Sequence, residues 1–164
     1  MKSALSTSTT CLRNWINSMN RITKEQLSEL SHKDQVRFAL FCAYQLKDQW
    51  INPGICMDAL KVVEMWLEDK ANIEECSKAT KIFWTYSHNE DIVVLYALAT
   101  THFCVYTNYV STSENAMLAS KFVISHMALS PNSTHFVIQE QRDYYNELRY
   151  IDNIFEDIVL KEIV

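Results

Sequence analysis

The stretch Ile92-Val93-Val94-Leu95-Tyr96-Ala97-Leu98-Ala99 decides the fold, because it is the most apolar part of the chain. Its first three residues, taken alone, are typical of a strand, since β-branched side chains suit a pleated sheet. The run extends to Tyr106, however, and its length and its alanine and leucine residues favour a helix that is buried on all sides. We therefore predict a helix over 92–106 as the most buried element of the protein.

The glycine and proline content supports a fold without sheets. The chain of 164 residues contains one glycine, Gly54, and two prolines, Pro53 and Pro131. Hairpin turns and bulges need glycine, because only glycine takes a positive φ at little cost. Loops that cradle phosphate groups need it for close backbone approach. The composition therefore argues against a β-sandwich, a P-loop and a dinucleotide-binding fold.

Capping residues divide the chain into helices. Thr23 with Gln26, and Asn72 with Glu75, have the spacing of a capping box, in which two side chains satisfy free backbone donors at a helix start. Further helix starts are expected at or just after Ser31, Asn52, Asn89, Ser113 and Ser130. Two short helices are expected over residues 11–20 and 24–30, and the longer predicted helices cover residues 32–50, 53–69, 73–86, 92–106, 114–129 and 133–163.

These segments predict one all-α domain. Residues 1–10 are rich in serine and threonine and are expected to fray, whereas no linker rich in glycine, serine or proline interrupts residues 11–164. We predict a single-domain bundle of six or seven antiparallel helices that ends in a long C-terminal helix. The helices between 32 and 129 also fit an arrangement of stacked helix pairs.

The charge distribution favours a basic protein partner over nucleic acid. The formal net charge is −5, and the acidic excess lies after residue 50, whereas residues 1–50 are net basic. An acidic surface repels a phosphate backbone and attracts a basic protein surface. The alternative interpretation is a solvated face that only maintains solubility.

The cysteines indicate a reducing compartment. Their number is odd and no two are closely spaced, and the five are Cys11, Cys42, Cys56, Cys76 and Cys104. This pattern predicts buried free thiols and a cytoplasmic location. The start of the chain lacks a signal-peptide pattern, and no apolar run is long enough to span a bilayer, so no membrane contact is expected.

No residue pattern predicts catalysis or a metal site. No two histidines are four residues apart and there is no Cys-x-x-Cys pair, so the usual zinc-ligand spacings are missing. His102 and Cys104 are two residues apart, which directs their side chains differently on a helix. The acidic pairs Glu74-Glu75 and Glu90-Asp91 lie at expected helix starts, where the helix dipole explains them. We therefore expect neither enzymatic activity nor a cofactor.

The last predicted helix combines aromatic residues with many acids. Tyrosine is frequent at interfaces because it buries a large area and keeps a polar tip. The residues that we predict to contact a partner are Glu140, Asp143, Tyr144, Tyr145, Glu147, Asp152 and Glu156. The alternative is that the tyrosines are core residues, since a near-heptad seam runs through Val137, Tyr144, Leu148, Ile151, Phe155 and Ile158.

Two neighbouring segments, Ala59–Leu67 (ALKVVEMWL) and Lys70–Cys76 (KANIEEC), resemble bacterial all-helical immunity proteins of polymorphic toxin systems. In that family a helix that ends in a Trp-Leu-like pair is followed by a short turn, a capped helix and alanine-rich helices. The resemblance covers roughly residues 32–128 and leaves out the long C-terminal helix. This chain departs from the family in having more aromatic and fewer alanine residues, and in having Glu68 and Asp69 in place of a glycine at the turn.

The resemblance implies a non-catalytic inhibitor that binds and blocks a toxin, and a phage protein that blocks a host defence protein would share these features. We therefore predict an acidic, immunity-protein-like inhibitor that occludes a protein partner with a basic surface. One alternative is a helical scaffold or homodimer subunit whose seam pairs with itself. Another is an enzyme whose site is assembled from scattered residues.

Overall fold

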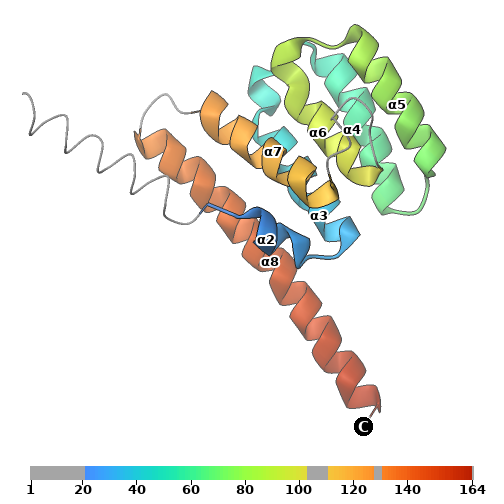
Figure 1. Ribbon diagram of the computed structural model, residues 1–164, viewed down its shortest axis with the longest axis vertical. Coiled ribbons are helices and arrows are strands. Elements are labelled where there is room, and N and C mark those ends of the chain that lie inside the picture. The colour runs from blue at the N-terminus through green and yellow to red at the C-terminus, as the bar shows by residue number, and fades with distance from the viewer. Residues whose placement is uncertain (1–20, 103–110, 128–130, 164) are drawn as a thin grey trace, which may run out of the picture.

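The protein is an all-α bundle in a computed structural model that describes residues 21–102, 111–127 and 131–163, with the side chains of the last range described over 133–150 (Figure 1). The helices are α2 (Lys24–Ser28), α3 (His32–Gln45), α4 (Pro53–Leu67), α5 (Ile73–Tyr86), α6 (Ile92–Thr101), α7 (Thr112–His126) and α8 (Pro131–Ile163). Two 3-10 turns, η1 (Lys47–Gln49) and η2 (Asn89–Asp91), stand before α4 and α6. The all-helical prediction is confirmed, while the predicted frayed segment over 1–10 and the predicted helix over 11–20 lie outside the described residues.

Helix α6 forms the centre of the bundle, as its apolar run predicts. Eight of its ten residues are buried, and it packs against α3, α4, α5 and α7 (Figure 1). The strand alternative for residues 92–94 is therefore wrong. The helix ends earlier than predicted, where the hydroxyls of Thr100 and Thr101 donate to the carbonyls of Ala97 and Leu98 at 2.5 and 2.6 Å. The Leu98 carbonyl is one of the last four of the helix, which have no amide partner within it, so the Thr101 hydroxyl supplies the missing donor.

Side-chain caps set the starts of α2, α3 and α5 where the sequence predicts them. Both predicted capping boxes form, one between Thr23 and Gln26 and the other between Asn72 and Glu75. The prediction that Ser113 caps α7 is wrong, because the Ser111 hydroxyl accepts the hydrogen bond from the Glu114 amide at 3.3 Å. The Ser-x-x-Glu spacing from Ser111 to Glu114 is the usual helix-start pattern, so α7 begins two residues earlier.

The corner between α3 and α4 depends on Asp91. Helix α3 ends at Gln45 rather than near residue 50, and the Asp91 carboxylate accepts hydrogen bonds from the amides of Ile51 and Asn52 at 2.9 and 3.0 Å. Asp91 lies at a helix start, as predicted, because it is the N-cap residue of α6. Its buried carboxylate, however, satisfies two backbone donors of the α3–α4 corner rather than the first amides of α6. Burial, with a contribution from Asp91, raises the pKa of the Cys56 thiol to about 12.

At the end of α4, an aspartate takes the backbone conformation that glycine usually fills. The Lys70 amide donates to the Met65 carbonyl at 2.8 Å and the Asp69 amide donates to the Trp66 carbonyl at 3.1 Å. These two bonds form a Schellman motif, which needs a left-handed residue just after the helix. Asp69 has φ of 60° and fills that position. Aspartate takes this conformation more readily than most residues, although glycine does so at lower cost.

Substitution of Asp69 tests this turn. Asp69→Gly and Asp69→Ala both remove the carboxylate that pairs with Lys33 at 2.9 Å, a solvent-exposed pair that contributes little to stability. Only glycine avoids the Cβ clash of the left-handed conformation. We expect the glycine variant to be more stable than the alanine variant by about 1 kcal/mol in urea unfolding. Equal stability of the two variants would show that the turn is not left-handed in solution.

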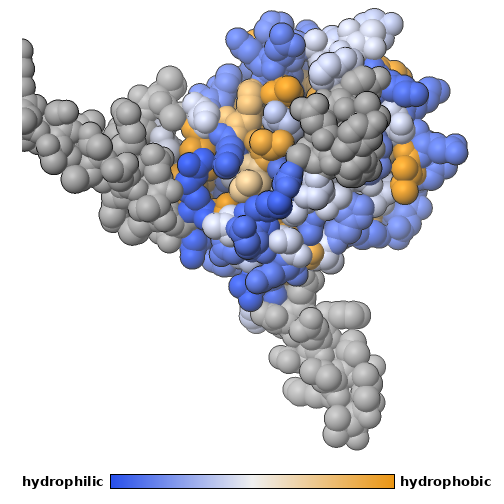
Figure 2. All heavy atoms as spheres, in the orientation of Figure 1, coloured by the Kyte–Doolittle hydropathy of each residue, from blue (hydrophilic) through white to orange (hydrophobic). Residues whose placement is uncertain are grey.

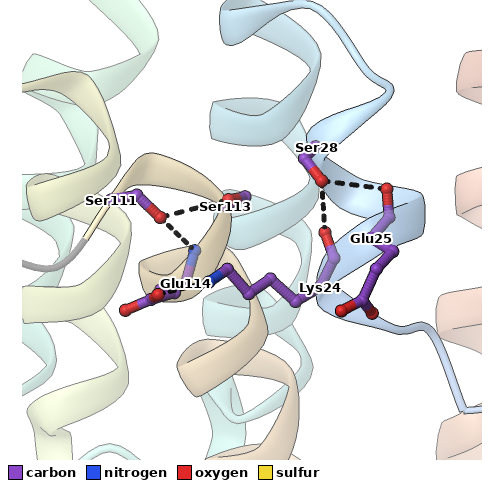
Figure 3. Close-up of polar contacts among 6 residues, drawn as sticks. All are labelled: Lys24, Glu25, Ser28, Ser111, Ser113 and Glu114. Atoms are coloured by element: carbon purple, nitrogen blue, oxygen red, sulfur yellow. Dashed lines mark hydrogen bonds and ion pairs between the residues drawn. The ribbon is translucent and has the colours of Figure 1, made fainter.

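Helix α2 joins the start of α7 to the bundle. The Lys24 ammonium group reaches across and pairs with the Glu114 carboxylate (Figure 3). On the α2 side, the Ser28 hydroxyl donates to the carbonyls of Lys24 and Glu25, both at 2.9 Å (Figure 3). Since α2 packs mainly on α7, this partly exposed pair adds a polar contact between the two helices.

Candidate protein-interaction face

Helix α8 lies along one side of the bundle, and its C-terminal half extends past the other helices (Figure 1). It packs on α3 and α7. The described side chains that face the bundle recur at helical spacing and are buried: Val137, Ile138, Gln141, Tyr145 and Leu148. Because these five residues share one face, the opposite face of the helix is presented to solvent.

A chain of hydrogen bonds around the buried Gln141 side chain sets the rotation of α8. The Ser120 hydroxyl of α7 donates to Gln141 Oε1 at 2.5 Å, and Gln141 Nε2 donates to Gln45 Oε1 of α3 at 2.9 Å. Gln45 Nε2 then donates back to the Val137 carbonyl at 3.4 Å. Gln141 is 1% exposed, and a buried amide without partners is costly. The network therefore stabilises one rotation of α8 over the others.

The two predicted contact tyrosines, Tyr144 and Tyr145, face the bundle. Tyr145 is 2% exposed and its hydroxyl donates to the Gln26 carbonyl at 3.4 Å. Tyr144 is half-buried and stacks on Phe41 of α3, with ring centroids 4.4 Å apart and planes 8° apart; burial raises its pKa. The expectation that Tyr145 contacts a partner is therefore corrected, because its ring belongs to the core.

The exposed face of α8 carries a different pair of aromatic residues. Phe136 is 65% exposed and Tyr150 is 66% exposed. Between them Asp143 and Glu147 are exposed as well, at steps of seven, four and three residues that keep all four on one side of the helix. We call these four residues the outer ridge of α8. Along the helix axis the two rings are about 21 Å apart.

The outer ridge is acidic and its carboxylates are available. Among the described residues, Asp143 and Glu147 have no basic partner at salt-bridge distance. Asp143 accepts a hydrogen bond from the Gln139 amide at 2.8 Å, which holds its carboxylate along the ridge. Glu140, a predicted contact, is partly exposed. Asp152 and Glu156, also predicted contacts, lie in α8, but their side chains are outside the described residues.

Sequence reasoning missed Phe136 and gave Tyr150 less importance than Tyr145. A signal was present, because Phe136, Asp143 and Tyr150 are spaced by seven residues, in a different phase from Val137 and Tyr144. Two heptad series therefore run along the same helix, and tyrosine occurs in both. Burial separates them, and burial depends on which series faces α3 and α7.

The other candidate sites found in the sequence show no assembled chemistry in the described part of the chain. His102 ends α6, and burial lowers its pKa, while Cys104 lies outside the described residues. The cysteines Cys42, Cys56 and Cys76 are free and buried, as predicted. Within the described residues, no group of three or more histidine, cysteine, aspartate or glutamate side chains is placed to hold a metal ion.

Hydrophilic residues predominate on the described face in Figure 2, with apolar patches between them. None of the described helices is both long and apolar enough to cross a membrane. No protein-family model, curated protein or solved structure matches this chain.

The role of Gln141 can be measured by removing its hydrogen bonds at nearly constant volume. Gln141→Met removes the side-chain amide that binds both the Ser120 hydroxyl and the side-chain oxygen of Gln45. We expect it to lower the free energy of unfolding by about 1–3 kcal/mol. The matched control is Gln139→Met, the same change on the outer side of the helix, which we expect to stay within about 0.5 kcal/mol of the parent. Equal effects in denaturant titrations would contradict the network.

Proposed function

We propose that this protein is a non-catalytic, immunity-protein-like inhibitor that binds a basic surface of a toxin or defence protein through the outer ridge of α8. The observation that carries the proposal is the combination of two exposed rings, Phe136 and Tyr150, with two exposed carboxylates, Asp143 and Glu147, that have no basic partner within the described part of the chain. All four stand on one helix whose rotation the buried Gln141 network holds.

The composition of the ridge supports protein binding. Aromatic side chains act as anchors because they bury a large area with few rotatable bonds. Carboxylates beside them accelerate association with a basic surface and discriminate against acidic ones. Because α8 is already ordered against α3 and α7, little conformational entropy is lost when a partner binds.

The net charge and the cysteines of the chain support an inhibitor that acts in a reducing cytoplasm. Its net charge is −5, and Cys42, Cys56 and Cys76 are buried free thiols, which fits a compartment where thiols stay reduced. The resemblance of residues 59–76 to immunity proteins points in the same direction. Occlusion requires no catalytic group of its own, so the proposal does not depend on one.

A second candidate is a scaffold or homodimer in which α8 pairs with its own copy. The extension of the C-terminal half of α8 past the bundle favours it (Figure 1). However, Val137 and Leu148 of the predicted seam are buried within the same chain, so that half of the seam is already occupied. Light scattering separates the two candidates, since a monomer at micromolar concentration would exclude stable self-pairing.

The inhibitor proposal predicts a large effect of the ridge aromatics. A basic partner isolated from the source cells by affinity capture and then purified is titrated against the parent protein and against the double variant Phe136→Ala/Tyr150→Ala. Loss of two anchor rings is expected to weaken binding at least about thirtyfold, which corresponds to about 2 kcal/mol. The charge variant Asp143→Asn/Glu147→Gln is expected mainly to slow association at low salt.

The control for these variants is Ile73→Ala, which trims an exposed apolar side chain on α5. It is expected to leave partner affinity unchanged. Retention of full affinity by the double aromatic variant, with its helical circular dichroism intact, would rule out the ridge as the binding site. A captured partner without a basic surface would rule out the charge argument.

A further inference from the structure

Helices α4 and α5 form an antiparallel hairpin with an apolar groove along its outer side. The groove has a volume of about 330 Å³. Its lining residues are Ile55, Asp58, Ala59, Val62, Ala79, Ile82, Phe83 and Tyr86. Seven of these eight residues are uncharged, and Asp58 is the one charged residue among them. Helices α4 and α5, which supply the lining of the groove, lie on a different side of the bundle from α8 (Figure 1).

The groove exists because small residues face each other between the two helices. Ala59 and Ala79 line it, and an alanine on each helix leaves space that larger side chains would fill. Phe83 is 2% exposed and closes the bottom. By contrast, Ile82 is 49% exposed and Tyr86 is 65% exposed. Two large apolar side chains thus stand at the edge of a depression without being covered by the described residues, a feature typical of a docking surface.

Asp58 gives the groove a charge preference. Its carboxylate is exposed, and among the described residues it has neither an ion-pair partner nor a hydrogen-bond donor. Other carboxylates of the chain, such as Asp91 and Glu114, are satisfied internally. A carboxylate at the edge of an apolar groove attracts a lysine or arginine, and this attraction strengthens when a docked helix covers the groove and excludes water from the pair.

We propose that the α4–α5 groove docks an amphipathic helix of a partner protein that carries one lysine or arginine at the edge of its apolar face. A helix fits a groove between two helices by placing residues at steps of three and four into it. Its basic residue would pair with Asp58. A second copy of this chain fits less well, because two-fold pairing of the groove with itself brings two Asp58 carboxylates into one apolar interface.

The inference is independent of the outer ridge and can be tested without knowing the natural partner. The probes are three fluorescent synthetic peptides, each an amphipathic leucine-rich helix, identical except for lysine, glutamine or glutamate at one position beside the leucine face. Binding to the full chain is followed by fluorescence anisotropy, and the site is located by amide chemical shifts. We expect the lysine peptide to bind about tenfold more tightly than the glutamine peptide, or about 1.4 kcal/mol, and the glutamate peptide to bind least tightly.

Variants of the groove separate charge from apolar contact. Asp58→Asn is expected to abolish the preference for lysine over glutamine while leaving the glutamine peptide unaffected. Ile82→Ala is expected to weaken the binding of all three peptides. Ile73→Ala, the same change elsewhere on α5, is expected to leave the binding of all three unchanged.

Three results would overturn the inference. The first is equal affinity of the three peptides for the parent protein, and the second is chemical-shift changes located away from α4 and α5. The third is self-association of the chain, seen by sedimentation, that Ile82→Ala abolishes, since this would assign the groove to a second copy. If the groove inference fails, the proposal for the outer ridge of α8 still stands, because it is tested with variants on a different helix and with a different binding partner.

Discussion

A chain of hydrogen bonds from Ser120 through the buried Gln141 to the partly buried Gln45 sets the rotation of α8 about its axis. A rotation by one residue, about 100°, would turn the Gln141 amide away from both partners and move Tyr145 out of the core. Apolar contacts alone tolerate sliding and rotation more easily than a directional polar network does. This network therefore determines which of the two heptad series of α8 faces solvent, and with it the identity of the outer ridge.

The other helices of the bundle hold the residues of that network in position. Helix α6 is buried among α3, α4, α5 and α7, so it fixes the positions of α3 and α7, which supply Gln45 and Ser120. The pair between Lys24 and Glu114 joins α2 to the start of α7, and Asp91 holds the corner that precedes α4. The result is a bundle with two outward features on different elements, the acidic ridge of α8 and the apolar α4–α5 groove. Such a division would allow one protein to contact a partner at two places, or two partners at once.

Local signals are sufficient to predict the helices but not which face of α8 is exposed. The capping boxes at Thr23 and Asn72 and the apolar run over α6 act within a few residues, so the sequence alone predicts them. The end of α3 and the burial of Asp91 depend on contacts between residues about 40 apart, which no local pattern contains. Tyr145 and Tyr150 illustrate the same limit, because both lie on α8 and only the position of α3 and α7 distinguishes core from surface. At the turn after α4, the sequence shows that glycine is absent. It does not show that Asp69 takes the left-handed conformation in its place.

The orientation of α8 is tested most directly by hydroxyl-radical footprinting with mass spectrometry, which compares the oxidation rates of aromatic residues on one helix. In the folded protein, Phe136 and Tyr150 are expected to oxidise much faster than Tyr145, and the two tyrosine rates are expected to converge in denaturant. Equal rates for Tyr145 and Tyr150 in the folded state, or faster oxidation of Tyr145, would show that α8 presents a different face.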